Sequence, residues 1–414
     1  MTIVKEIRVK KKLQLYLHIP FCIKKCDYCD FLSFPLGAKE WPEGEILSGA
    51  PGVNPSLTLG QTLAVNEKVK SQYIRALESE IKNAKDKFKD YEVSTIFMGG
   101  GTPSILSCEE MIAIFTALKE TFEIDNEVEI TIEANPGTVT EDKVATWKKV
   151  GINRVSIGLQ SANDEELKWL GRVHTFGQFK ESFLLLRENG FSNINVDLIS
   201  GVPGQTIKSY METLNQVIEC NPEHISAYGL MIEEGTTFAE NLYPALPSEE
   251  TERLMYKVTK EQLEQQGYHR YEISNYAKEG FECRHNLGYW ERADYLGLGL
   301  GAASLFENTR FHQVKDLEQY VELFTHGKAC QPEEVLILDE KEQMEEFMFL
   351  GLRKTKGISI AKFNDKFSRK MDEVYGHVLL KLEKESFIEN NGDEIKLTEK
   401  GIDISNVILS EFIF

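Results

Sequence analysis

Long apolar runs are missing from this sequence. None of its stretches reaches the roughly 20 consecutive apolar residues that a membrane-spanning helix needs. The first segment, MTIVKEIRVKKK, is basic and lacks the apolar core of a secretory signal. We therefore expect a cytoplasmic protein without a stable membrane anchor.

Cysteine is scarce and mostly scattered. Of the seven cysteines, four stand alone in the sequence: Cys108, Cys220, Cys283 and Cys330. Such irregular spacing does not form the paired framework of a disulfide-rich secreted protein. The pattern favours a reducing compartment.

Positive charge is also in short supply. The chain has 47 basic against 66 acidic residues, which gives a formal net charge of -19. A polyanionic backbone repels such a chain, so we expect no nucleic acid as a partner. The one basic run, Lys5–Lys12, is interpreted as a solvated arm.

Three cysteines do stand together, Cys22, Cys26 and Cys29, in the segment LYLHIPFCIKKCDYCDF. Their C-x3-C-x2-C spacing can bring three thiolates to one cuboidal 4Fe-4S cluster and leave one iron without a protein ligand. An open iron can hold S-adenosyl-L-methionine (SAM) for radical chemistry. Zinc, which usually takes four ligands, and a chance grouping are the alternatives. The segment closely resembles the cluster loop of the radical SAM enzymes.

Short β-rich runs alternate with helical patterns over the first two thirds of the chain, which is typical of βα units around a parallel sheet. We predict an α/β fold: an incomplete six-stranded parallel (β/α)6 barrel. Candidate chemical residues fall at or just beyond the strand ends, which form the active face of such barrels. The predicted strands are Gln14–Ile19, Ser94–Met98, Glu129–Glu133, Arg154–Leu159, Ile194–Leu198 and His224–Gly229. The predicted helices are Asn66–Lys87, Ser107–Thr121, Glu141–Val150, Phe176–Asn189 and Ser209–Glu219.

Two regions depart from this alternation. Residues 34–62 are rich in glycine and proline without periodicity and are interpreted as an insertion, either a lid or a linker, in which Trp41 is a candidate shield for the cluster. From residue 339 the pattern is helix, helix, helix, hairpin, which predicts a mostly α, winged-helix-like domain with a structural or substrate-covering role. The predicted domains are 1–232, 233–338 and 339–414. The C-terminal elements are predicted at Glu342–Leu352, Ser359–Phe367, Met371–Glu385, Phe387–Asn390 and Gly392–Leu397.

Polar and glycine residues mark the predicted mouth of the barrel. Gly99–Thr102 follows an apolar strand, and its glycines let the backbone approach a ligand closely, although a tight turn is the alternative. Glu133 offers a carboxylate for hydroxyls or an ammonium, unless it is an ordinary surface residue. Arg172 can fork onto a carboxylate, and a buried Asp197 needs a partner.

These motifs together resemble the HemN/HemW group, which comprises oxygen-independent coproporphyrinogen III oxidases and their heme-chaperone relatives. The resemblance covers nearly the whole chain. It implies that Cys22, Cys26 and Cys29 are the cluster ligands and that Tyr16, Gly100 and Glu133 contact SAM. It also implies that the rest of the SAM region, including any second SAM, is lined by Tyr28, Gly101, Thr102, Gln160, Arg172 and Asp197.

Features that distinguish the two branches of the group favour the chaperone. Phe31 occupies the position of the oxidase's last cysteine, and the segment before Tyr16 is short. The segment His285–Trp290 matches the H-N-x-x-Y-W motif of HemW-type proteins, so heme is an expected cofactor and His285 a candidate ligand; a buried structural histidine is the alternative. We therefore expect a heme chaperone that passes heme to an acceptor protein and receives electrons from a donor, with oxidative decarboxylation of coproporphyrinogen III as the alternative. Enzymatic activity, the acceptor and the oligomeric state stay open.

Overall fold

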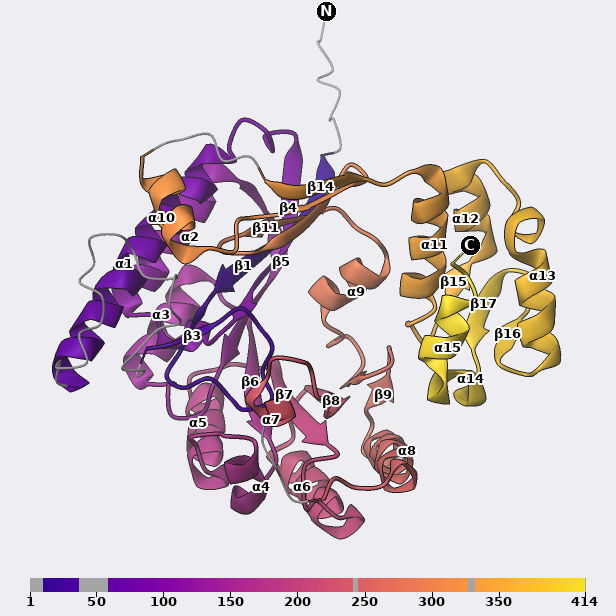
Figure 1. Cartoon of the computed structure of the whole chain (residues 1–414), viewed down its shortest axis with the longest axis horizontal. Coiled ribbons are helices and arrows are strands. Elements are labelled where there is room, and N and C mark those ends of the chain that lie inside the picture. The colour runs from indigo at the N-terminus through magenta and orange to yellow at the C-terminus, as the bar shows by residue number, and fades with distance from the viewer. Residues whose placement is uncertain (1–9, 37–58, 241–244, 327–331, 414) are drawn as a thin grey trace, which may run out of the picture.

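A twelve-stranded sheet forms the frame of the molecule (Figure 1). The computed structural model describes residues 10–36, 59–240, 245–326 and 332–413. The strands run in the order β14-β13-β12-β11-β1-β4-β5-β6-β7-β8-β10-β9. The six central strands are parallel and agree with the six predicted from the sequence: β1 (Lys11–Ile19), β4 (Tyr91–Gly100), β5 (Glu123–Ala134), β6 (Arg154–Gln160), β7 (Ile194–Ser200) and β8 (His224–Gly229).

Both edges of the sheet extend beyond the prediction. β11 joins β1 in parallel, while β10 pairs antiparallel with β8, so β1 and β8 do not meet and the barrel stays incomplete. These strands are short and follow no βα rhythm, which is why the sequence pattern did not reveal them. They are β9 (His269–Arg270), β10 (Asn275–Ala277), β11 (Tyr295–Leu298), β12 (Ala303–Phe306), β13 (Thr309–His312) and β14 (Glu333–Ile337). Two further short strands, β2 (Phe21–Cys22) and β3 (Phe34–Pro35), pair with each other.

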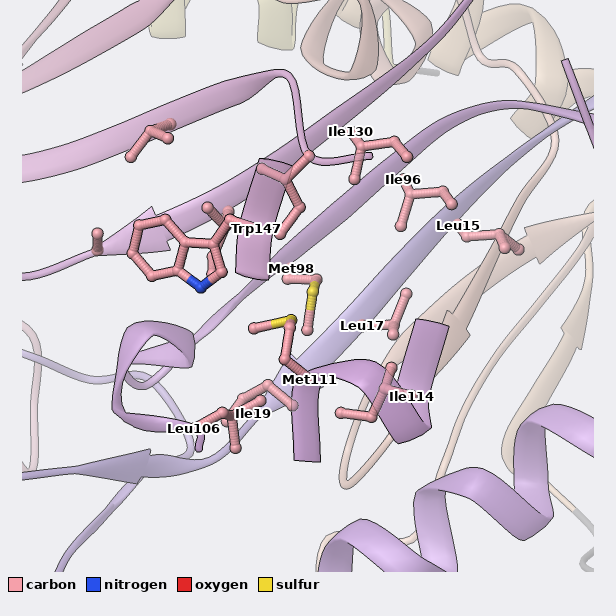
Figure 2. Packing of buried hydrophobic residues seen from close by; sticks show 14 of the residues in the cluster. Leu15, Leu17, Ile19, Ile96, Met98, Leu106, Met111, Ile114, Ile130 and Trp147 are labelled. Carbon is pink, nitrogen blue, oxygen red and sulfur yellow. The ribbon is translucent and has the colours of Figure 1, made fainter. Parts of the chain in front are cut away.

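Helices cover the outer face of the parallel strands because every second strand residue there is apolar. Leu15 and Leu17 of β1 and Met98 of β4 belong to one hydrophobic cluster with Ile114 and Trp147 of the covering helices (Figure 2). The helices of this layer are α1 (Leu59–Asn83), α2 (Cys108–Thr121), α3 (Glu141–Val150), α4 (Asp164–Trp169), α5 (Phe176–Glu188), α6 (Ile207–Cys220), α7 (Thr237–Glu240), α8 (Glu249–Gln265) and α10 (Leu317–Thr325), with a 3-10 turn at Pro103–Ile105. The remaining helix, α9 (Arg284–Trp290), packs on the inner side of the sheet, where it contacts Gln14 of β1 and Glu129 of β5.

One predicted boundary in this layer is wrong. Helix α1 begins at Leu59, seven residues before the predicted start at Asn66 and inside the predicted insertion. Leu59, Gln61, Leu63 and Ala64 are good helix formers, so the helix extends toward the N-terminus into the glycine-rich composition despite Gly60. Trp41 lies outside the described residues.

A second hydrophobic core lies at the C-terminus, between residues 344 and 412. Its helices and its three-stranded sheet, in the order β15-β17-β16, agree with the predicted winged-helix-like pattern. Two ion pairs tie this unit to the barrel: a buried one in which Glu346 accepts from Arg292, and one between the buried Arg270 and the exposed Glu399. The exact domain limits stay predictions. The elements are α11 (Glu340–Gly351), β15 (Ile358–Ser359), α12 (Ile360–Phe367), α13 (Met371–Lys384), β16 (Ile388–Asn390), β17 (Glu394–Leu397), α14 (Glu399–Asp403) and α15 (Ser405–Ser410).

Among the helices that the structure describes, none combines the length and the apolar composition needed to cross a membrane. The end of the basic run leads into β1 at Lys11. Lys10 pairs with Glu123, and Lys12 pairs with Glu92 and Asp125. The described part of this run is therefore a set of solvated ion pairs rather than a free basic arm.

Candidate functional site

The predicted site residues converge at the carboxyl ends of the parallel strands. Gly100 ends β4, Glu133 is the last but one residue of β5, and Gln160 ends β6 with a left-handed φ of 73°. Asp197 is an exception, because it is the fourth of seven residues in β7 and lies inside the barrel rather than at its rim. The strand-end prediction holds for the others and is wrong for Asp197.

The cysteine loop follows β2 and lies against the glycine loop and the end of α4. Thr102 Oγ1 donates to Cys22 Sγ at 3.4 Å, and Arg172 Nη1 donates to Cys26 Sγ at 3.4 Å. The backbone turns tightly, since Cys29 N–H donates to the Cys26 carbonyl at 3.1 Å. Burial, together with the neighbouring thiols of Cys26 and Cys22, raises the pKa of Cys29 to about 11.

The donor set of this loop fits a cuboidal cluster. No three Cys, His, Asp or Glu side chains in the described ranges are arranged to hold a single metal ion. A tetrahedral zinc site requires such convergence on one point, whereas a cuboidal cluster takes one thiolate at each of three separate irons. The guanidinium of Arg172 lies beside Cys26 and offers a positive charge to a thiolate-bound cluster.

The glycine loop supports the segment that leads into the cysteines. Gly101 N–H donates to the Ile19 carbonyl at 2.8 Å, and Thr102 N–H donates to the Phe21 carbonyl at 2.7 Å. A Cβ at Gly101 would lie 2.6 Å from the Phe21 carbonyl oxygen. Gly100 has a φ of +105°, and a Cβ there would overlap the His18 ring. Both positions therefore require glycine for close packing and backbone conformation.

His18 connects this region with the end of the cysteine loop. Its Nε2 lies 2.8 Å from the Leu32 carbonyl, which only accepts, so Nε2 carries the proton. Its Nδ1 therefore accepts from the Tyr16 hydroxyl at 3.0 Å. Burial lowers the pKa of His18 and keeps the ring neutral. The lone pairs of the Tyr16 oxygen are thus left to accept from a ligand.

Two carboxyl groups with elevated pKa values, those of Glu133 and Asp197, come from β5 and β7, the strands on either side of β6. Glu133 Oε2 accepts from Gly100 N–H at 3.2 Å, while Asp197 accepts from Ser156 at 2.9 Å and from Asn195 at 2.8 Å. Burial raises the pKa of Glu133 to about 8, and the charge of Asp197 adds to the shift. Burial also raises the pKa of Asp197. Glu133 is thus no ordinary surface residue.

A pocket beside the cysteine loop gathers other predicted residues. Arg172 Nη2 donates to the Asn135 side chain and to the Gly158 carbonyl, both at 2.6 Å, and Asn135 donates to Thr102 at 2.9 Å. Tyr28 packs against a small apolar cluster around Leu170. The pocket is lined by Ile23, Lys24, Cys26, Thr102, Asn135, Pro136, Thr138, Gly171, Arg172, Val173 and His174.

His285 does not lie in this site. It is buried in α9, with Nδ1 at 2.7 Å from the Thr95 hydroxyl and Nε2 at 2.9 Å from the Tyr289 hydroxyl. Burial lowers the pKa of His285 to about 3, and Arg154 contributes to the shift. Neither ring nitrogen is available to an iron, so the prediction of a heme ligand is not supported in this conformation. The motif instead forms a helix that packs on β4 and β1.

Helix α9 closes a polar barrel interior that was not predicted from the sequence. Glu129 of β5 accepts from the backbone N–H groups of Arg284 and His285, both at 3.1 Å, and so caps α9. Arg154 of β6 is buried at 2% exposure. The period-two pattern of polar residues in the central strands could have shown this inward face, for example Arg154, Ser156 and Gln160 in RVSIGLQ.

Comparison with known proteins places this geometry in context. Residues 16–217 match the family model of the Radical SAM superfamily, and residues 338–404 match that of the HemN C-terminal domain. The heme chaperone HemW of Bacillus subtilis is 34% identical over 402 residues, which cover 96% of this chain and 98% of that protein. The heme chaperone HemW of Escherichia coli is 37% identical over 290 residues, 70% of this chain and 69% of that protein.

A solved structure shares the whole fold. Coproporphyrinogen III oxidase (HemN) from Escherichia coli superposes with a TM-score of 0.80 at 24% sequence identity and covers 98% of this chain and 91% of that chain. The likeness confirms the incomplete barrel with its C-terminal helical domain.

Proposed function

The chain belongs to the HemW family within the radical SAM superfamily, and from this membership we propose that it binds heme and transfers it to an acceptor protein. The observation that carries the proposal is near-full-length similarity to heme chaperones, at 34% identity over 96% of the chain. At the position of the oxidase's last cysteine this chain has Phe31. This departure from the oxidase motif resembles HemW-type proteins and supports the same choice.

The proposed cofactors are a 4Fe-4S cluster and SAM. Cys22, Cys26 and Cys29 would hold the cluster, with Thr102 and Arg172 donating to the first two thiols. Tyr16, Gly100 and Glu133 would orient the SAM, and the predicted contacts of Tyr28, Gly101, Thr102, Gln160, Arg172 and Asp197 stay proposals. When bound and reduced by an electron donor, the cluster supplies electrons for chemistry at SAM.

We place the heme at the barrel mouth instead of at His285. Heme needs an accessible apolar surface, and exposed apolar side chains surround the mouth. Phe31 is 63% exposed, Val173 60% and Met231 69%; Ile23, Tyr228 and Ile232 extend the same rim. The segments that carry them touch, since Asp27 N–H donates to the Leu170 carbonyl and Phe238 N–H donates to the Asp27 carbonyl. Met231 brings a thioether, a known axial ligand of heme iron.

Decarboxylation of coproporphyrinogen III is the second candidate function. The observation that favours it is the set of predicted SAM contacts around Glu133 and Gly100, which a passive carrier would not need. In this alternative the same mouth would receive a porphyrinogen.

Rim variants test the proposed heme site. Phe31, Val173 and Met231 are replaced together by serine, and Leu184 and Leu380, equally exposed but on α5 and α13, are replaced by serine in a control protein. Heme affinity is measured anaerobically by absorption titration on cluster-reconstituted proteins. We expect at least a tenfold loss of affinity in the rim variant and an unchanged control. Equal affinities in all three proteins would refute the rim site, and a wild type that binds no heme would refute the function.

A further inference from the structure

Asn135 directly follows β5 and is hydrogen-bonded through both ends of its side-chain amide. Its Oδ1 accepts from Arg172 Nη2 at 2.6 Å, and its Nδ2 donates to Thr102 Oγ1 at 2.9 Å. A guanidinium can only donate, so the amide oxygen must face Arg172 and the amide nitrogen must face Thr102. The orientation of the Asn135 amide is therefore fixed by its two partners.

Each partner of Asn135 also reaches a thiol of the cysteine loop. Thr102 Oγ1 donates to Cys22 Sγ, and Arg172 Nη1 donates to Cys26 Sγ, both at 3.4 Å. Because Thr102 Oγ1 accepts a proton from Asn135, its own proton is left to point at Cys22. Donation thus runs in one direction, from Arg172 through Asn135 and Thr102 to Cys22, with a branch from Arg172 to Cys26.

The backbone of Asn135 is held as firmly as its side chain. Its N–H donates to Ser104 Oγ at 3.2 Å, and its carbonyl accepts from the N–H of Thr138 at 3.1 Å and from the Thr138 hydroxyl at 2.7 Å. Pro136 follows, which restricts Asn135 to extended backbone conformations. A residue held in this way can keep the side chains around it in one orientation toward a cofactor.

Hydrogen bonds to the sulfurs of an iron–sulfur cluster help to set its reduction potential, because they stabilise the more negative, reduced state. We propose that Asn135 is a positioning residue for the cluster, which raises the reduction potential by aiming the Thr102 hydroxyl and the Arg172 guanidinium at the cysteine sulfurs. The inference rests on the proposed 4Fe-4S cluster. Asn135 acts on that cluster through its two neighbours.

The reduction potential of the cluster tests this role. It is measured by anaerobic redox titration with electron paramagnetic resonance, on cluster-reconstituted protein of verified iron content and without SAM or heme. Asn135→Leu approximately keeps the size of the side chain but removes both hydrogen bonds. We expect a roughly tenfold shift of the one-electron equilibrium toward the oxidised cluster, which corresponds to a potential lower by about 59 mV. A purely structural role of Asn135 would lower the stability of the protein without this shift.

A double-variant cycle shows whether Asn135 acts through Thr102. Thr102→Val removes the hydroxyl and should lower the potential, whereas Thr102→Ser keeps the hydroxyl and should retain the wild-type value. In the Thr102→Val background, Asn135→Leu should shift the potential by less than it does in the wild type, because one of its two routes to the cysteines is already lost. Equal shifts in the two backgrounds would overturn the inference.

Asn153 supplies a matched control. Its amide is also bonded at both ends, to the Ile130 N–H at 2.8 Å and to the Val128 carbonyl at 2.7 Å, but it precedes β6 and so lies at the other end of the strands from the cysteine loop. Asn153→Leu should leave the potential unchanged. A control that shifts as far as Asn135→Leu would contradict the specific role of Asn135.

The outcomes separate this inference from the proposed cofactor. Equal potentials in the wild type and Asn135→Leu, each with a full cluster, would overturn the inference alone, whereas a wild type that assembles no cluster would refute the cofactor. If Asn135→Leu takes up no cluster, Asn135→Ala is measured in its place and should show the same lowering. Failure of both variants to assemble a cluster would also overturn the inference, because a residue that only aims hydrogen bonds is not required for assembly.

Discussion

Replacing His285 by alanine should destabilise the barrel without removing heme binding. The ring bridges Thr95 and Tyr289 through hydrogen bonds of 2.7 and 2.9 Å, and it packs on Phe97 with ring centroids 5.2 Å apart. Alanine would leave the buried Thr95 hydroxyl and the half-buried Tyr289 hydroxyl without these partners. An unsatisfied buried polar group costs about 1–3 kcal/mol. With the cavity left by the ring, we expect a loss of about 3–5 kcal/mol in the free energy of unfolding.

The assay combines stability and ligand binding on the same protein. Urea unfolding of the cluster-free protein is followed by circular dichroism, and heme affinity is titrated on the folded variant. His326→Ala is the matched control, because that histidine is exposed and, within the described residues, its ring bonds only to the Glu322 carbonyl of its own helix. The control should change the free energy of unfolding by less than about 0.5 kcal/mol. A His285→Ala protein with wild-type stability and no bound heme would refute the structural role and restore His285 as a ligand.

Three further perturbations follow from the same contacts. Gly100→Ala forces a side chain into a left-handed position against the His18 ring, so SAM binding should be lost; wild-type affinity in a calorimetric titration would argue against the close packing. Glu346→Gln removes the charge of a buried carboxylate that pairs with Arg292 at 2.5 Å, so the free energy of unfolding should fall by about 3 kcal/mol in urea denaturation. An unchanged free energy of unfolding would mean that this ion pair does not hold the C-terminal unit to the barrel. Burial raises the pKa of Glu80 from 4.5 to about 7, so the folded state binds the proton more tightly than the unfolded state does. The free energy of unfolding should therefore decline by on the order of 3 kcal/mol as the pH rises from 4.5 to 7. Glu80→Gln should remove this pH dependence, and a variant that retains it would refute the assignment.

The parallel strands and the cysteine loop could be predicted because each leaves a local pattern. Strands such as Arg154–Gln160 alternate or run apolar between turn residues, and the spacing of Cys22, Cys26 and Cys29 is independent of the rest of the chain. The winged-helix-like pattern was equally local, since Asp339 caps α11 through a reciprocal hydrogen bond with Glu342. These features require no knowledge of which segments meet in space.

The sequence left two roles open for His285, a heme ligand or a buried structural histidine, because the choice depends on contacts between distant segments. The chain returns α9 to the base of the barrel, where Glu129 accepts from the His285 N–H across 156 positions of sequence. Long-range pairing of this kind leaves only the weak period-two pattern of polar residues in the strands.

The most direct test of the central claim is one anaerobic experiment on cluster-reconstituted wild-type protein. One sample receives heme, and a second receives coproporphyrinogen III with SAM and a reductant; bound heme and released carbon dioxide are followed together. A heme chaperone predicts stable, stoichiometric heme in the first sample and no loss of propionate carboxylates in the second. Formation of protoporphyrinogen IX would contradict this account and identify the chain as an oxidase despite Phe31.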